Sequence, residues 1–361
     1  MDSRLLDSLN EQAANTRDPI AWARTVCRAA AHYARHGMSA EALTAIKNVR
    51  NHYGTDLDPE VASWLMLAEG VLNYFLARTA EAYGRIRTAY GLAVALQTDS
   101  ALPICAAWMA LIEFHDGEYV KMCSHLEEAL TQAKSDDHPA HARASLVLAD
   151  AYHLSGSYLL ARPWYEEARF RAADDGDNAS LSAMLHNVAS IRAANTRLDD
   201  TFGLDAVKET QRASLETASS RHYDHAINTH GLGFLSLLLR GLTKTLSKNF
   251  AEAIDLFMQV DPEKLQRQML SPYYIDLAWC HTNIGHSDEA DRYLTTALTS
   301  ATEMKEDDDR AYFYSRAAQV AERLARQLEA DSFRIDANQY LTKHREFQIR
   351  LRNQLDMIRK K

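Results

Sequence analysis

The chain has 361 residues, of which 47% are hydrophobic, and its formal net charge is −9. This acidic balance argues against a general binder of nucleic-acid backbones, because such binding depends on clustered positive charge. Glycine and proline are scarce, with 13 and 7 residues, and almost no stretch alternates apolar and polar residues at the period of a strand. The composition therefore predicts an all-α fold.

The sequence carries no obvious signal for export or for membrane insertion. Its start, MDSRLLDSLNEQ, lacks a basic segment followed by an apolar run, and nowhere do about eighteen apolar residues stand together. We therefore expect a cytoplasmic protein. Its cysteines, Cys27, Cys105, Cys123 and Cys280, follow no metal-binding or redox spacing, which favours small, reduced core residues.

Residues 1–17 are expected to form a capping helix or a frayed end. The chain then repeats a pattern of two short helices, and its clearest copy is Ser145–Arg169. In this copy Ala149 and Ala161 provide the small surfaces at which two helices approach closely, and Gly156 allows the left-handed turn between them. One such hairpin cannot bury its own apolar faces, so neighbouring copies are required.

Three kinds of residue mark the other copies. Equivalents of Ala161 recur about every forty residues, at Ala42, Ala82, Met122, Thr201, Ala253 and Ala290. The turn position is glycine in four copies, at Gly37, Gly117, Gly156 and Gly285. Prolines fall near the expected starts of first helices, at Pro19, Pro59, Pro103, Pro139 and Pro272.

The pattern GxYxxAxxxYxxA after a helix of small and aromatic residues resembles the tetratricopeptide repeat. Besides the copy around Gly156, the clearest matches are Ala30, Tyr33, Gly37, Ala42 and Ile46; Gly117, Tyr119, Leu126 and Ala129; and Ala278, Gly285, Ala290, Leu294 and Ala297. The resemblance covers roughly residues 19–327. It implies a right-handed α-solenoid of about seven helix hairpins, as in the sensory arrays of bacterial signalling proteins. We assign residues 1–330 to this array and 331–361 to a C-terminal helix.

Some stretches depart from the pattern. The fifth copy is expected to turn at Thr196, and an insertion lies within 204–238, where solenoids place loops or lengthened helices on one face. Pro163 predicts that the second helix of the fourth copy starts late or bends. A last helix is expected over 312–328, separated from the seventh copy by the acidic residues 307–309.

The C-terminal helix carries an apolar seam. Its positions alternate by four and three, as in a short coiled coil, at Tyr340, His344, Phe347, Leu351, Gln354 and Ile358. One interpretation is a homodimer through Tyr340, Phe347, Leu351 and Ile358; the other is a cap on the last repeat. A helix leaving such an array also resembles the linker to an output domain, such as a diguanylate cyclase, although no motif of such a domain follows here.

Motifs of enzyme chemistry are missing. The sequence has no phosphate-binding loop, no HExxH, no GxSxG and no CxxC pair, so we expect neither an enzyme nor a cofactor. His222, His225 and His230 in the insertion are weak candidates for a metal site, because His222 and His225 share a helical face. The alternative is that these histidines lie on a solvent-facing side.

The inner groove is the favoured binding site. The resemblance implies that first helices line it, and the register gives candidate polar residues from three copies: Arg143, Asp150 and His153; His186, Asn187 and Ser190; and Asp276, Trp279, Thr282 and Asn283. Such a lining suits an extended peptide or a small ligand. The paired lysines and asparagines of the family's carboxylate clamp are absent.

Two classes of function follow. The favoured one is a non-catalytic module that binds a protein, a peptide or a small ligand, without nucleic acid or membrane, and that acts as a sensory or regulatory scaffold coupled through its C-terminal helix to a partner or output domain. The alternative is a metal-dependent or otherwise catalytic helical protein that uses His222, His225 and His230.

Overall fold

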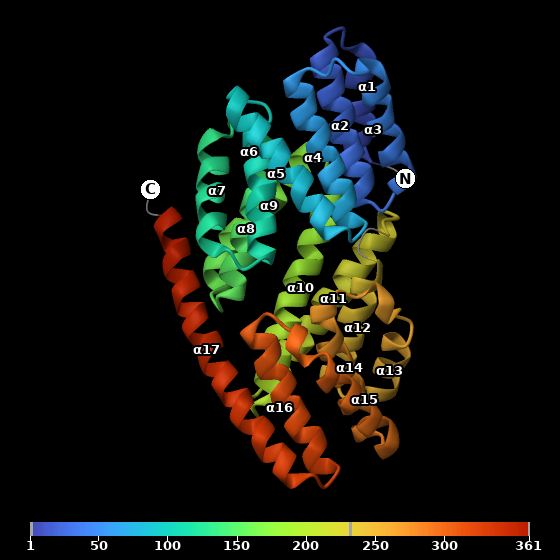
Figure 1. Ribbon diagram of the computed structural model, residues 1–361, viewed down its shortest axis with the longest axis vertical. Helices are drawn as coiled ribbons and strands as arrows, with labels where there is room; N and C mark the ends of the chain where they lie inside the picture. Colours follow the sequence, from blue (N-terminus) through green and yellow to red (C-terminus); the bar gives the residue numbers. More distant parts are fainter. Residues whose placement is uncertain (1–2, 231–232, 360–361) are drawn as a thin grey trace. The chain divides into compact units, whose positions relative to one another are not determined.

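The computed structural model describes residues 3–230 and 233–359, and within them it contains helices and no strand (Figure 1). The predicted all-α fold, an array of helix hairpins, is confirmed. The helices are α1 (Arg4–Asn15), α2 (Pro19–Arg35), α3 (Ser39–Tyr53), α4 (Pro59–Phe75), α5 (Thr79–Leu96), α6 (Leu102–His115), α7 (Tyr119–Gln132), α8 (His138–Leu154), α9 (Tyr158–Asp175), α10 (Asn178–Thr201), α11 (Val207–Ala226), α12 (Gly233–Leu246), α13 (Phe250–Phe257), α14 (Arg267–Asn283), α15 (Ser287–Thr299), α16 (Asp307–Arg323) and α17 (Gln327–Arg359).

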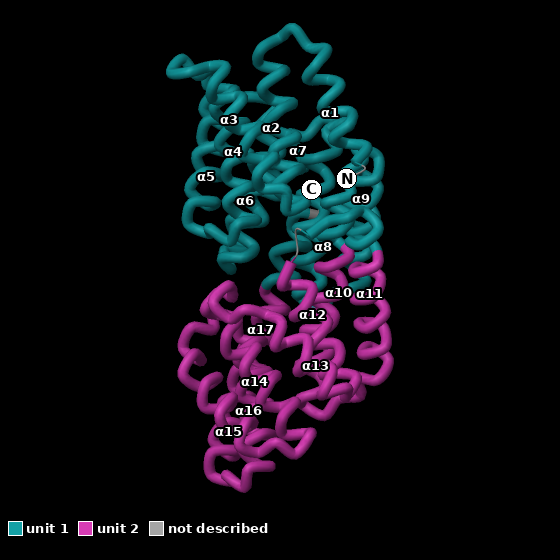
Figure 2. Tube along the Cα trace, turned by 90° about the vertical axis from the view of Figure 1, so that its right-hand side faces the viewer, with its two compact units in different colours: residues 1–184, 223–232, 351–361 teal, residues 185–222, 233–350 magenta. Residues whose placement is uncertain are grey.

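The chain divides into two compact units, coloured separately in Figure 2. Unit 1 comprises residues 1–184, 223–232 and 351–361, and holds α1 and the four hairpins from α2/α3 to α8/α9. Unit 2 comprises residues 185–222 and 233–350, and holds the hairpins α12/α13 and α14/α15, together with α16 and most of α17. Helices α10, α11 and α17 contribute residues to both units.

First and second helices of the hairpins differ in burial because they occupy different layers. In α6 every residue from Pro103 to Glu113 is buried, and α8 is buried almost throughout. In α5, by contrast, only the stripe Ala82, Ile86, Ala89 and Ala93 is buried. A helix that is apolar on all sides needs neighbours on all sides, so the first helices form the inner layer of unit 1.

The predicted repeat register agrees with the packing. Ala42, Ala82, Met122, Ala161, Ala253 and Ala290 are all fully buried. Four of the marking prolines stand at the starts of α2, α4, α6 and α8. Pro272 does not, because α14 begins earlier, at Arg267.

The hairpin turns use a left-handed residue even where glycine is missing. Gly37, Gly117 and Gly156 have φ between 73° and 79°, and Ala77 takes the equivalent conformation with φ 58°. The second copy therefore turns as sharply as the others. The conformation costs an alanine roughly 1 kcal/mol or more.

The fifth copy does not turn where the sequence predicted. Helix α10 continues through Thr196 to Thr201, and the left-handed residue is Gly203, with φ 76°. The hydroxyl of Thr196 donates to the carbonyl of Arg192 at 2.7 Å, so its polar group is paired inside the helix. Within the insertion the structure places the 20-residue helix α11, and α10, which precedes the insertion, has 24 residues.

Two further helix ends differ from the expectation, while a bend of α9 at Pro163 stays a prediction. Helix α9 begins at Tyr158 with Pro163 inside it, so it does not start late; the carbonyl that Pro163 cannot bond belongs to the exposed Leu159, where water has access. The last helix ends at Arg323 rather than near residue 328, because Ala325 adopts φ 60° and starts a new turn. The acidic residues 307–309 form the first turn of α16, where the helix dipole favours them.

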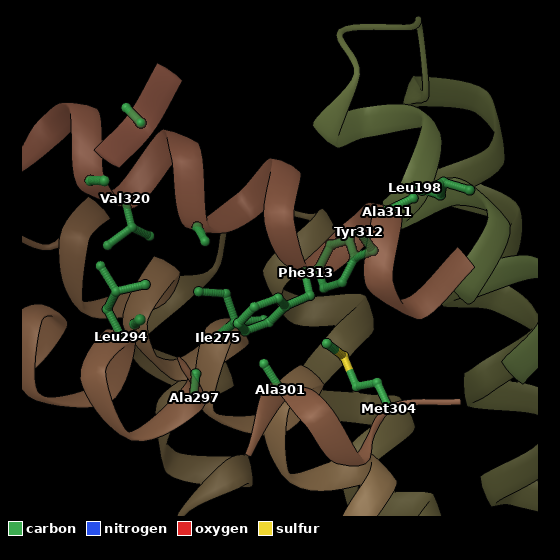
Figure 3. Packing of buried hydrophobic residues seen from close by; sticks show 14 residues of the cluster. Leu198, Ile275, Leu294, Ala297, Ala301, Met304, Ala311, Tyr312, Phe313 and Val320 are labelled. Atoms are coloured by element: carbon green, nitrogen blue, oxygen red, sulfur yellow. The ribbon is translucent and has the colours of Figure 1, made fainter. Parts of the chain in front are cut away.

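The core of unit 2 gathers around the hairpin α14/α15 and α16 (Figure 3). Ile275, Leu294 and Phe313 are fully buried there. Tyr340 of α17 packs against the same cluster, with its ring stacked on Tyr314 at a centroid distance of 5.6 Å. None of the helices in the described part of the chain combines the length and apolar character that crossing a bilayer requires.

Candidate functional site

The four hairpins of unit 1 close back on themselves, because α2 contacts the segment that joins α9 to α10. A guanidinium nitrogen of Arg35 donates to Oδ2 of Asp177 at 2.6 Å. The His36 ring lies 2.8 Å from Oδ1 of Asn178, and Arg28 pairs with Asp175 at 3.4 Å. These contacts join residues more than 140 positions apart, so the first helices surround an interior space.

That space is a cavity of about 420 Å³. Helices α1, α2, α4, α6 and α8 all contribute to its wall, with apolar side chains such as Leu9, Trp64 and Trp108 and charged ones such as Arg143 and Asp177. The volume lies within the range of about 300–1,000 Å³ that is typical of ligand sites. We regard this cavity as the candidate binding site.

Arg143 is the most unusual side chain of the cavity. Only 7% of its surface is exposed, and its guanidinium lies over the ring of Trp108, 4.3 Å from the centroid. In the described residues it has neither an ion pair nor a hydrogen bond. Burial, followed by the positive charge of Arg35, lowers its pKa to about 10. Arg143 therefore stays charged at neutral pH, although no carboxylate of the described residues lies within ion-pair distance and its charge is favoured by Asp177 and Asp150 only at longer range.

Arg35, in contrast, is neutralised. Burial alone would raise the pKa of Asp177, but Arg35 and His32 hold it well below its usual range. Ser180 accepts a further bond from Arg35 at 2.8 Å, and Ser3 lies 3.0 Å from Nε2 of His32. Burial lowers the pKa of His32, whereas Asp177 acts in the opposite direction, and the pair consists of a cationic Arg35 and an anionic Asp177 beside this ring.

Acidic side chains line another part of the wall. They include Asp136, Asp137 and Asp175, and burial raises the pKa of Asp137 and of Asp175. Asp137 also caps α8 by accepting a bond from the backbone of Ala140 at 3.3 Å. The cavity therefore offers both an uncompensated cation and carboxylates, which suits a ligand that carries both signs of charge.

The other two groove candidates of unit 1, Asp150 and His153, interact with a side chain of the same unit. Tyr165 donates to Asp150 at 2.8 Å, and Nδ1 of His153 lies 3.2 Å from the same hydroxyl. Both are buried inside α8 and neither lines the cavity. Of the three residues predicted from the fourth copy, only Arg143 faces it.

The candidates from the fifth and seventh copies belong to unit 2. His186, Ser190 and Asp276 line a smaller cavity of about 180 Å³. Asp276 accepts a hydrogen bond from Tyr312 and pairs with Arg197 at 3.6 Å. Its charge is thus compensated within the fold.

The remaining candidates make local contacts. Trp279 lies beneath Arg316 and Arg323, with centroid distances of 4.4 and 4.9 Å. Thr282 and Asn283 donate to backbone carbonyls one turn earlier, at 2.7 and 2.8 Å, and Asn187 is half-buried in α10.

The repeat register did not point to Trp108, Arg35 or Asp177. A signal existed for the tryptophans, because Trp64 follows Pro59 at the same spacing as Trp108 follows Pro103. Both therefore occupy one position of the first helix. No signal pointed to Asp177, which meets Arg35 only because the hairpins close on themselves.

The histidines of the insertion do not gather into a metal site. Among the described residues, the ligand atoms close enough to hold one ion together belong to His281, His286 and Glu289 instead.

The C-terminal seam lies against its own chain. Leu351 is only 1% exposed, and His344 is buried. Near the end of α17, Asp356 accepts a bond from Tyr152 of α8 at 3.2 Å. Phe347 and Ile358 are half-buried.

Fold and cavity together define a helical-repeat scaffold built from two-helix hairpins. Residues 103–172, which hold α6, α7, α8 and most of α9, match the family model of the tetratricopeptide repeat, and this confirms the resemblance for the two most regular copies. The comparison with curated proteins found no match. Among solved structures, the apo form of RapI is similar, with a TM-score of 0.49 and 10% identity over 94% of this chain and 92% of that chain.

Proposed function

We propose that the chain is a non-catalytic binding module that takes up a short peptide, or the end of a protein partner, in the cavity of unit 1. The observation that carries the proposal is Arg143, a buried cation that lies over Trp108 and has no ion pair or hydrogen bond among the described residues. Burying a charge without compensation is costly. A ligand carboxylate placed against Arg143 would supply the missing charge and accept two parallel hydrogen bonds.

The rest of the wall favours a peptide over a multiply charged anion. Asp136 and Asp137 would repel a second negative group and would attract an amino group or a basic side chain. Trp64 and Trp108 offer apolar surface in the same wall. A peptide with a free carboxyl terminus and a positive charge at its other end matches this arrangement.

Free and amidated peptides test the proposal. The intact chain, without an affinity tag, is mixed with randomised short peptides that end in a free carboxylate, and in parallel with the same pool carrying C-terminal amides. Tryptophan fluorescence reports occupancy, because Trp64 and Trp108 line the cavity. We expect the free-acid pool to change the emission and the amide pool to have much less effect. Equal responses would refute the role of the carboxylate.

Two finer features belong to the same proposal. Binding would be transmitted to a partner or output domain, such as a diguanylate cyclase, through α17, which contributes residues to both units. Of the two interpretations of this helix, the burial of Leu351 within its own chain favours packing against that chain over a homodimer. A catalytic role of His222, His225 and His230 gains no support, since these histidines form no metal-binding group among the described residues.

A further inference from the structure

The turn between α14 and α15 in unit 2 brings together three side chains that can bind a metal ion. His281 lies in the last turn of α14, His286 directly precedes α15, and Glu289 lies in the first turn of α15. Each offers one ligand atom, and these atoms all lie within 4.8 Å of one another. Two imidazoles and one carboxylate form a donor set typical of zinc and related transition metals.

His281 supplies an independent observation. Its side chain is nearly buried, with 9% of the residue exposed, and its Nδ1 has no hydrogen-bond partner within the described structure. Buried ring nitrogens are normally paired.

The backbone and a neighbouring ring hold the group in place. The amide of His286 donates to the carbonyl of His281 at 3.0 Å, and Gly285 between them has φ 82°. Tyr293 of α15 stacks on the His281 ring at a centroid distance of 5.3 Å. The two histidines are therefore ordered by the turn itself.

The surrounding charges act in both directions. Glu289 favours a cation at His281, whereas His286 and Arg292 oppose one. The Arg292 guanidinium is drawn over the ring of Tyr293, 4.9 Å from the centroid. Asp288 adds a second carboxylate to the first turn of α15.

We propose that the α14–α15 turn binds a divalent transition-metal ion of the zinc class through His281, His286 and Glu289. His286 and Glu289 are exposed, so the ion enters from solvent and keeps at least one water ligand. Such a site would join the end of one helix to the start of the next and stabilise the hairpin.

Cobalt is a suitable probe, because its visible absorption reports the coordination geometry of a site that also takes zinc. The intact, tag-free chain is titrated with Co²⁺ at neutral pH, followed by displacement with Zn²⁺. We expect one equivalent of Co²⁺ to give a visible band that Zn²⁺ removes. A chain that shows no band and no stoichiometric uptake of either metal would overturn the proposal.

Variants locate the site. Loss of an outer partner of a metal ligand already costs about 10–100-fold in affinity, so His286→Ala and Glu289→Gln should each weaken binding at least about tenfold. Both residues are exposed, so the variants should fold. His222→Ala is the matched control and should bind as the wild type does. Unchanged affinity in His286→Ala, or a loss only in His222→Ala, would assign the metal to another place and refute the proposal.

Discussion

At the scale of single residues, two arginines of one cavity illustrate opposite uses of a buried charge. Arg35 has Asp177 at 2.6 Å and is part of the fold. Arg143 has Trp108 beneath it and makes no ion pair with a carboxylate of the described residues. Buried cations that the fold does not compensate are expected at binding sites, and this difference distinguishes a structural arginine from a ligand-binding one.

Substitution by methionine should separate these two roles. Arg143→Met should leave the free energy of unfolding within about 1 kcal/mol of the wild type or raise it, because an uncompensated buried charge is removed. Arg35→Met should cost about 3–5 kcal/mol, because it leaves Asp177 buried without its partner. Denaturant unfolding measures both values. A large loss in Arg143→Met would mean that this arginine also holds the fold together.

His36 should make stability depend on pH. Burial, followed by the charge of His32, lowers its pKa to about 4, whereas in the unfolded chain it is about 6.5. Between these values the unfolded chain binds a proton that the folded chain does not. Stability should therefore fall as the pH falls through this window, by roughly 1.4 kcal/mol per pH unit from this group.

His36→Gln isolates this contribution. Burial and neighbouring carboxylates raise the pKa of Glu306 to about 7, which acts in the opposite direction, but it is common to both proteins. The melting temperature of the variant should therefore change less between pH 7 and pH 5 than that of the wild type. Parallel curves would show that His36 does not titrate as the structure implies.

At the scale of elements, the sequence predicted the helix pairs better than it predicted the helix ends. Small residues at fixed spacing identified the hairpins, because small side chains allow two helices to pack closely together. Helix ends were less predictable. Helix α10 continues through Thr196, whose hydroxyl is hydrogen-bonded to the backbone one turn earlier. Ala325 adopts a left-handed conformation that glycine usually takes. These two helix ends depend on local backbone and side-chain interactions, which a repeat pattern does not reveal.

Ala161→Leu tests the close approach of α8 and α9. Ala161 is fully buried, and extra methylenes in such a contact force shifts that cost roughly 1–3 kcal/mol. Thermal unfolding of the variant should show this loss, while Leu159→Ala, at an exposed position of the same helix, should have little effect. Equal stabilities would mean that the helices are not in close contact at Ala161.

At the scale of the whole molecule, the sequence predicted the array but not that the four hairpins of unit 1 close on themselves. The contact of Arg35 with Asp177 joins distant parts of the chain, and no local pattern marks it. The groove candidates illustrate the consequence: Arg143 lines the cavity of unit 1, whereas Asp276 lines another cavity in unit 2. A register shows which residues are equivalent, but not how many copies surround one space.

The role of α17 can be tested by truncation. A chain that ends at Asp336 lacks Leu351 and Leu355, both almost fully buried, and burial of one leucine contributes about 1.5–3 kcal/mol. We expect the short chain to lose at least about 3 kcal/mol of stability, and both chains to sediment as monomers. A dimer of the intact chain that the truncation converts to a monomer would favour the coiled coil instead.

The most direct test of the account is a calorimetric titration of one peptide selected from the free-acid pool against the wild type and Arg143→Met. The account predicts binding to the wild type, weaker binding of the amidated peptide, and a loss of at least about tenfold in Arg143→Met, equivalent to about 1.4 kcal/mol. Equal affinity of the wild type and Arg143→Met would contradict it, because the ligand would then not need the buried arginine that has no ion pair within the described chain.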